Sequence, residues 1–200
     1  MLFSSPPWDE ALYWALDLET GGFDAKRDPI LAVGMVPVRG GTIRLGESYR
    51  TLVRPEAGKA LDPDSVRYHQ LVWGEVRDAP PLASVMPEVE RRLSGAVLLV
   101  HHASVDVAFL RRAFKGLGIR WPSPQVVDTV DLLIRAASRS RFRNPDVPDD
   151  LPNLNLGKAR RALGLPEYQA HDALTDAIAA AELFLVLRKV IGAKRLRQLR

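Results

Sequence analysis

The chain has 200 residues, of which 46% are hydrophobic, enough to bury the core of one domain. It contains no cysteine, which excludes a disulfide framework and a thiolate metal site. Its 28 basic and 24 acidic residues give a net charge of +4, a modest excess that permits a polyanionic partner without requiring one.

Two features bear on where the protein resides. The N-terminal stretch MLFSSPPWDE lacks the basic and apolar regions of a signal peptide. The longest apolar stretch, residues 177–187, contains Glu182 and is too short to cross a bilayer. We therefore expect a soluble, cytoplasmic protein without a membrane partner.

Strand patterns occupy the first part of the chain, and helical and strand patterns alternate in the rest. Residues 13–18, 29–38 and 42–55 are runs typical of strands, and Gly40-Gly41 predicts a hairpin turn between the last two. The later patterns predict, in chain order, helix 82–93, strand 96–102, helix 104–117, a short strand leading into a helix over 125–138, and helices 154–165 and 170–192. This order predicts an α/β domain with a mixed sheet covered by helices.

The second half of the chain also contains a capping signal and an irregular stretch. Asp128, with Asp131 three residues later, is explained as the N-cap and first turn of a helix. Residues 139–153 are rich in charge and proline and have no periodicity, so we expect them to be the least ordered part of the chain.

Four acidic residues stand where the patterns favour apolar or neutral side chains. Asp17 and Glu19 are two positions apart on a strand, so their carboxylates leave the same face. Asp106 follows strand 96–102, and Asp176 lies on an otherwise apolar helix face. Carboxylates in such positions repel each other and lose solvent, so they need a positive partner. Because Mg²⁺ and Mn²⁺ take carboxylate ligands, we expect two such divalent cations as cofactors.

The acidic residues fall into three motifs. They are ALDLETGG with Asp17 and Glu19, HHASVDVAFL with Asp106, and HDALTDA with His171 and Asp176. In this order they resemble the exonuclease motifs of the DnaQ-like family of 3′–5′ exonucleases, which includes the proofreading domains of the DNA polymerase III epsilon type. The histidine five positions before the last aspartate is similar to the histidine branch of that family.

The resemblance covers about residues 10–187, nearly the whole chain. It implies a ribonuclease H-like α/β fold, in which helices flank a central mixed five-stranded sheet. We therefore expect an N-terminal extension over 1–9, an exonuclease domain over 10–187 and a basic C-terminal tail over 188–200.

The resemblance also implies a role for each motif residue. Asp17 would bridge two cations, Glu19 and Asp176 would complete the first cation site, and Asp106 would support the second. Neutral His171 would accept the proton of the attacking water. The products would be nucleoside 5′-monophosphates released from the 3′ end of a single strand.

The spacing of histidine and aspartate does not by itself identify the base. His101 and Asp106 have the same separation as His171 and Asp176. The family's motif order and the residues that follow the second histidine select His171.

Six residues are expected to contact the terminal nucleotide: Thr20, Gly21, Gly22, Phe23, His69 and His102. Glycine permits a close backbone approach, and Phe23 either wedges against a base or packs in the turn. Gly21, His102 and Val105 stand where the family commonly has threonine, asparagine and phenylalanine, and these departures affect how the nucleotide is held.

Two basic segments admit two interpretations each. Arg135, Arg139, Arg141 and Arg143 form either a track for phosphates or a solvated helix face and loop. The amphipathic tail 188–200 either binds nucleic acid or caps the domain.

The function that we predict is a metal-dependent exonuclease on single-stranded nucleic acid, DNA in the first instance, with a role in repair or proofreading. A proofreading role would make a DNA polymerase a partner. An oligoribonuclease or RNA-trimming exonuclease of the same family would use the same five residues and stays open. A non-catalytic module bound to a polymerase would be expected to have lost one of these residues, and all five are present.

Overall fold

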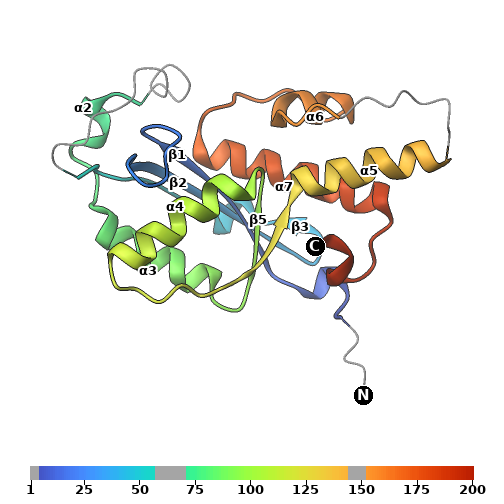
Figure 1. Ribbon diagram of the computed structural model, residues 1–200, viewed down its shortest axis with the longest axis horizontal. Helices are drawn as coiled ribbons and strands as arrows, with labels where there is room; N and C mark the ends of the chain where they lie inside the picture. Colours follow the sequence, from blue (N-terminus) through green and yellow to red (C-terminus); the bar gives the residue numbers. More distant parts are fainter. Residues whose placement is uncertain (1–4, 57–70, 144–151) are drawn as a thin grey trace.

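A computed structural model of the chain describes residues 5–56, 71–143 and 152–200, without the side chains of 140–143 (Figure 1). The strands are β1 (Tyr13–Thr20), β2 (Ile30–Arg39), β3 (Thr42–Ile43), β4 (Tyr49–Leu52), β5 (Val97–Val100) and β6 (Gln125–Asp128). The α-helices are α2 (Trp73–Val76), α3 (Leu82–Leu93), α4 (Ala103–Gly116), α5 (Thr129–Arg143), α6 (Leu156–Ala162) and α7 (Ala173–Ile191). Short 3-10 helices cover η1 (Trp8–Glu10), η2 (Leu45–Glu47) and η3 (Leu196–Leu199).

The strands form one mixed sheet with β1 in its middle. Its order is β3-β2-β1-β5-β6, and β4 also pairs with β2, at a stretch of β2 that β3 does not reach. β1 runs antiparallel to β2 and parallel to β5, and β5 runs parallel to β6. The mixed sheet and its flanking helices are confirmed, with six described strands in place of the five expected.

The sixth strand arises because the run 42–55 does not form one strand. η2 interrupts it, and Leu45 at the start of that turn is 58% exposed. The run is therefore divided into β3 and β4, which pair with two different stretches of β2. The hairpin at Gly40-Gly41 is confirmed, since both glycines have positive φ and the turn joins the paired residues Val38 and Ile43.

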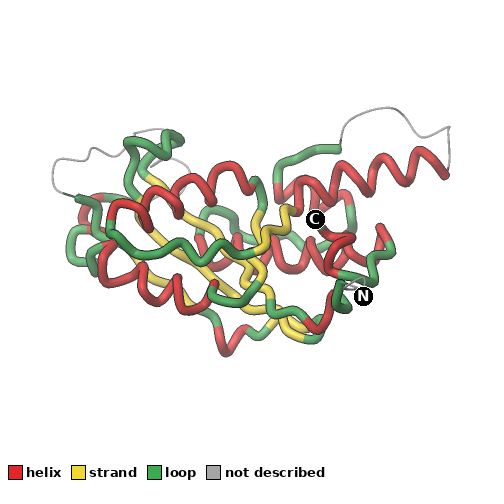
Figure 2. The backbone as a smooth tube through the Cα atoms, turned by 60° about the horizontal axis from the view of Figure 1, so that its bottom comes forward, coloured by secondary structure: helices red, strands yellow, loops and turns green. Residues whose placement is uncertain are grey.

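Helices cover both faces of the sheet (Figures 1 and 2). One apolar core lies between the sheet and α5, α6 and α7, and the other lies between the sheet and α3 and α4. Along β1, Tyr13 and Ala15 belong to the α7 side and Trp14 and Leu16 to the α3 side. Alternation along the strand carries the α7 face onward to Asp17 and Glu19.

The start of α7 lies directly against β2 at Gly34. A Cβ atom at this position would lie 2.1 Å from the carbonyl carbon of Ala173 and 2.2 Å from the nitrogen of Leu174. Gly34 is also the residue paired with Asp17 across the β1–β2 ladder. Glycine at this position therefore allows the first turn of α7 to come close to the acidic end of β1.

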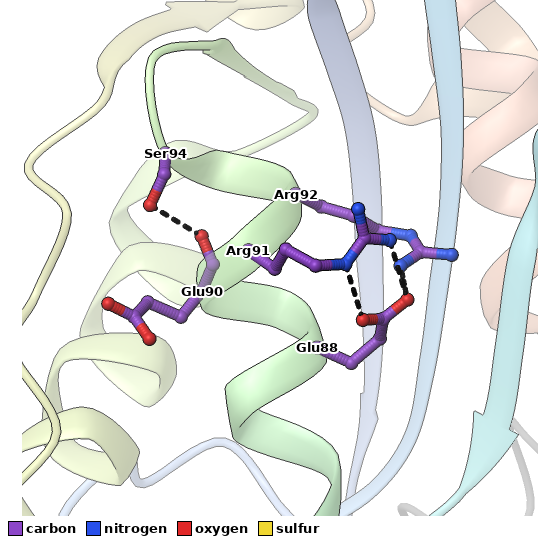
Figure 3. A network of polar contacts seen from close by, with 5 residues as sticks. All are labelled: Glu88, Glu90, Arg91, Arg92 and Ser94. Atoms are coloured by element: carbon purple, nitrogen blue, oxygen red, sulfur yellow. Dashed lines mark hydrogen bonds and ion pairs between the residues drawn. The ribbon is translucent and has the colours of Figure 1, made fainter.

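On the other face, an arginine attaches α3 to the sheet (Figure 3). The guanidinium of Arg92 lies 5.0 Å from the ring centre of Trp14 and 4.5 Å from that of Tyr49. Glu88, one turn earlier, pairs with Arg92 and accepts hydrogen bonds of 2.7 and 2.8 Å from Arg91. Stacking and pairing together fix the basic end of α3 over β1 and β4.

The expectation of an irregular segment from 139 is wrong for its first residues, because α5 continues to Arg143. The guanidinium of Arg139 donates to the Ile191 carbonyl at 2.6 Å, and that of Arg135 donates to the Gln198 carbonyl at 2.5 Å. These two hydrogen bonds join α5 to the end of α7 and to η3. Residues 144–151 of the expected segment lie outside the described part of the chain.

Both described ends of the chain pack against the domain. Leu196 and Leu199 are buried in the α7-side core, and the Trp8 amide donates to the Lys194 carbonyl at 3.2 Å. The segment 188–200 therefore packs against the domain, and its binding to nucleic acid stays a prediction. Among the helices of the described residues, none has the length and hydropathy needed to cross a membrane.

Replacing Gly34 by alanine tests the close approach of α7 to β2. The added methyl group has no room, so the free energy of unfolding should fall by about 1–3 kcal/mol in denaturant titrations. Gly46→Ala is the matched control, because nothing lies within 4 Å of the position of its added atom. Equal stability of the two variants would contradict the packing described.

Candidate active site

Three carboxylates from two elements meet at the acidic end of β1. Asp17 and Glu19 come from β1, and Asp176 comes from the first turn of α7. Each offers an oxygen atom, and these three atoms all lie within 4.8 Å of one another. The structure thus brings together residues that are about 160 positions apart in the chain.

Asp106 joins this group from the opposite side of the sheet. It lies in the first turn of α4 and is only 5% exposed. Its carboxylate accepts a hydrogen bond from the backbone amide of Leu18, which ties α4 to β1 between the two other acids. The Asp106 charge also contributes to raising the pKa of Asp17. All four acids selected from the sequence therefore belong to one cluster.

The electrostatic state of the cluster is set first by burial and then by repulsion. Burial, followed by the charge of Asp176, raises the pKa of Glu19 to about 7. Burial raises the pKa of Asp106 to about 8, although hydrogen bonds from the backbone oppose the shift. The pKa of Asp17 is raised well above its usual value by burial and by its acidic neighbours.

These observations fit divalent cations with a preference for oxygen ligands. Among the described residues, the charged groups that raise the pKa of Asp17 are all acidic: Asp106, Asp176, Glu19 and Asp172. Positive charge stabilises a group of partly buried carboxylates that repel each other. Mg²⁺ and Mn²⁺ prefer carboxylate oxygens as ligands. Asp17, Glu19, Asp176 and Asp106 are the residues that would hold them.

His171 lies beside the cluster, just before α7. Its backbone is left-handed, with φ of 70°, and its amide donates to Oδ2 of Asp176 at 2.7 Å. The next residue, Asp172, caps α7 by accepting from the Thr175 amide at 3.0 Å, and it pairs with Arg50 at 2.5 Å. His171 as a whole residue is exposed.

His101 has a different environment, although its spacing to an aspartate is the same. It is 9% exposed, its Nε2 donates to the Leu154 carbonyl at 2.8 Å, and its Nδ1 hydrogen-bonds the Thr129 hydroxyl at 2.7 Å. Burial lowers its pKa to about 4. His101 is therefore a neutral, buried link between β5, α5 and the segment before α6.

The glycines after Glu19 build a tight turn. The Gly21 amide donates to the Pro29 carbonyl at 2.8 Å, and the Thr20 hydroxyl donates to the Gly22 carbonyl at 2.7 Å. A Cβ atom on Gly22 would lie 2.2 Å from an oxygen of Asp28. Packing within the turn is thus one reason for a glycine at position 22.

Two other expected contact residues are placed by the structure, and one is not. Phe23 follows the turn and is 77% exposed, so it is not packed in the way that one interpretation predicted. His102 is exposed and left-handed at the start of α4, where its amide donates to Asp128 at 3.1 Å. The Val130 amide also donates to Asp128, at 2.9 Å, which confirms that Asp128 is the N-cap of α5. His69 lies outside the described residues.

Two of the four arginines of the expected basic track make contacts within the domain. Arg135 and Arg139 donate to carbonyls near the C-terminus, as described above, so these two do not line a free track. The side chains of Arg141 and Arg143 lie outside the described part.

Tyr168, which the sequence analysis missed, has a side-chain hydrogen bond with Asp176. The sequence offered one sign of this role: Tyr168 is an aromatic residue in a polar connection, shortly before His171.

Comparisons with known proteins identify the family of this chain. The family model described as Exonuclease (RNase T) matches residues 14–184. A protein of Mycobacterium tuberculosis, named as a bifunctional exonuclease/endonuclease, is 32% identical over 189 residues, covering 92% of this chain and 27% of the relative. A DNA polymerase III subunit epsilon-like protein of Rhodobacter capsulatus is 31% identical over 193 residues, covering 95% of this chain and 25% of the relative.

Among solved structures, E. coli exonuclease I in complex with a dA16 oligonucleotide has a similar fold. The TM-score is 0.75 at 17% identity, over 94% of this chain and 42% of that chain. The chain described here belongs to the exonuclease family, with a ribonuclease H-like fold. It spans about a quarter of the length of the two curated relatives.

The raised pKa values predict how the stability of the metal-free protein depends on pH. The native carboxylates bind protons up to about pH 7–8, whereas the unfolded ones lose them near pH 4. The native state therefore holds more protons, and the free energy of unfolding in chelator should fall as the pH rises through this range. Asp17→Asn removes one repelling charge and should make this fall shallower in unfolding titrations.

Asp131→Asn is the control, because Asp131 is an exposed acid on α5 outside the cluster, and its slope should equal that of the parent. Mn²⁺ should raise the melting temperature of the parent more than that of Asp17→Asn, since a ligand of the native state stabilises it by mass action. A metal-free parent that gains stability with pH would contradict the description of the cluster.

Proposed function

We propose that this protein is a divalent-metal-dependent 3′–5′ exonuclease that releases nucleoside 5′-monophosphates from single-stranded nucleic acid, DNA in the first instance. The observation that carries the proposal is the cluster of Asp17, Glu19, Asp106 and Asp176 with an exposed histidine beside it. Membership of the exonuclease family supports the same activity.

Each residue of the cluster has a task in this proposal. The four carboxylates would hold two divalent cations, which would supply activation of water and neutralisation of negative charge. His171 accepts the proton of the attacking water, because imidazole is the side chain best suited to act as a general base at neutral pH. The bond between its amide and Asp176 supports this role, since it keeps the histidine next to the cluster.

The turn after β1 is proposed to receive the terminal nucleotide. The exposed ring of Phe23 offers a stacking surface for a nucleobase, and the backbone of Gly21 and Gly22 lets the sugar approach. Thr20, His102 and His69 complete the contacts. A single-stranded DNA substrate is supported by the similar fold of E. coli exonuclease I, which was solved with a dA16 oligonucleotide.

A partner is proposed on the basis of one relative. The similarity to a DNA polymerase III subunit epsilon-like protein supports association with a DNA polymerase, in proofreading or repair. Cytoplasmic location follows from this proposal.

Polarity and metal dependence are tested with end-labelled oligonucleotides. Purified protein with Mg²⁺ or Mn²⁺ should release mononucleotides from single strands, and chelator should abolish the release. A 3′-phosphate block should slow digestion, whereas a 5′ block should not. Matched DNA and RNA strands identify the preferred substrate, and digestion of a closed circle at the rate of the linear strand would refute the exonuclease proposal.

His171→Ala tests the assignment of the base. The turnover number should fall by roughly 10²–10⁴-fold, the usual contribution of a general base, while Mn²⁺ binding by calorimetry is retained. His101→Asn is the comparison, because it removes a buried imidazole without removing the proposed base. This variant should have a lower melting temperature than the parent, while the folded protein keeps a turnover number close to that of the parent. The reverse result, with the large kinetic loss at His101, would make the assignment wrong.

A further inference from the structure

Arg160 on α6 is almost completely buried, at 2% exposure, and its position calls for a physical explanation. Its Nη1 donates to the Ala179 carbonyl at 2.9 Å and lies 2.6 Å from an oxygen of Glu182. Its Nη2 donates to the Pro166 carbonyl at 3.1 Å. A single guanidinium therefore joins α6, α7 and the connection between them, helices that lie against each other in Figure 1.

The remaining face of this guanidinium is covered by an aromatic ring. Its central carbon lies 4.9 Å from the ring centre of Tyr168, a half-buried residue of the α6–α7 connection. A guanidinium over a ring attracts it electrostatically, and more so when the pair is shielded from water. The fixed position of Arg160 thus fixes the ring of Tyr168.

The hydroxyl end of that ring reaches the acidic cluster. Tyr168 has a side-chain hydrogen bond with Asp176, and the tyrosine hydroxyl is its donor. Asp176 also accepts from the His171 amide at 2.7 Å. Both donors belong to the connection before α7, so this short segment holds one carboxylate of the cluster at two points.

Asp176 needs such support because its acidic neighbours repel it. Ligand oxygens of Asp17 and Glu19 lie within 4.8 Å of its own, so without donors its side chain would be driven away from them. Hydrogen bonds to an ionised carboxylate are stronger than those between neutral groups. Partners of this kind orient metal ligands before the cation binds.

We propose that Tyr168 is a positioning residue, which holds the Asp176 carboxylate in the orientation that receives a divalent cation, and that Arg160 holds Tyr168 in place. This role rests on the proposed function of the cluster. Neither side chain takes part in proton transfer; the chain of contacts runs from Glu182 through Arg160 and Tyr168 to Asp176.

The test is Tyr168→Phe, which removes the hydroxyl and keeps the ring over Arg160. Titration calorimetry of the full chain should show Mn²⁺ binding about 10- to 100-fold more weakly than in the parent. The Mn²⁺ concentration for half-maximal nuclease rate should rise in proportion, and the rate at saturating Mn²⁺ should return close to that of the parent. The melting temperature in chelator should change little, because the ring stays packed.

Tyr13→Phe is the matched control. Its hydroxyl also donates a hydrogen bond, to the Trp8 carbonyl at 2.6 Å, but Tyr13 stands at the other end of β1 from the carboxylates. This variant should bind Mn²⁺ as tightly as the parent. Glu182→Gln removes the charge that pairs with Arg160 and touches neither Tyr168 nor Asp176; it should weaken Mn²⁺ binding several-fold.

The outcomes separate this inference from the function on which it rests. Failure of the parent to bind Mn²⁺ would overturn the proposed function and the role of Tyr168 with it. Parental affinity in Tyr168→Phe, with binding intact in the parent, would overturn the role of Tyr168 alone. A rate that stays low at saturating Mn²⁺ would instead mean that the hydroxyl contacts the reacting groups. Parental affinity in Glu182→Gln would remove the Arg160 link from the arrangement.

Discussion

The close approach of α7 to β2 at Gly34 is the contact on which the rest of the site depends. Most of the length of the chain separates β1 from α7, and the close approach at Gly34 places the first turn of α7, with Asp176, near the carboxylates of Asp17 and Glu19. Any side chain larger than hydrogen at position 34 would occupy the space of the backbone of Ala173. The absence of a side chain at one position of β2 therefore determines where the third carboxylate lies.

The cost of gathering four carboxylates is met by the two cores that surround them. Burial and mutual repulsion raise the pKa values of the cluster, which means that the metal-free fold is weakened by its own site at neutral pH. Apolar packing on both faces of the sheet stabilises β1 and α7 independently of the acids. A fold held together in this way can present repelling charges to a cation without first having to be ordered by it.

The connections, rather than the regular elements, supply the finer contacts. The turn after β1 exposes Phe23, the segment before α6 is tied to His101, and the connection before α7 places His171 and Tyr168 around Asp176. Rigid elements thus carry the carboxylates, and shorter irregular segments orient them and shape the surroundings, a division common in enzymes.

Local signals in the sequence were enough to predict several of the elements and the acidic residues. Alternation predicted that Asp17 and Glu19 share a face of β1, paired glycines predicted the hairpin, and helical spacing predicted α3, α4 and α7. The motif order selected the four acids of the cluster, and family membership agrees with it. These features depend on residues that are neighbours along the chain, or on motifs that can be compared directly with those of a known family.

Features that depend on contacts between residues far apart in the chain could not be predicted in this way, and the fold revealed them. It showed that His101 is buried against Thr129 and Leu154, and that Arg135 and Arg139 bind carbonyls near the C-terminus. It likewise placed Arg160 and Tyr168 behind Asp176. An arginine or a tyrosine has the same local pattern whether it faces solvent or a partner far away in the chain, so its role follows from packing and not from periodicity.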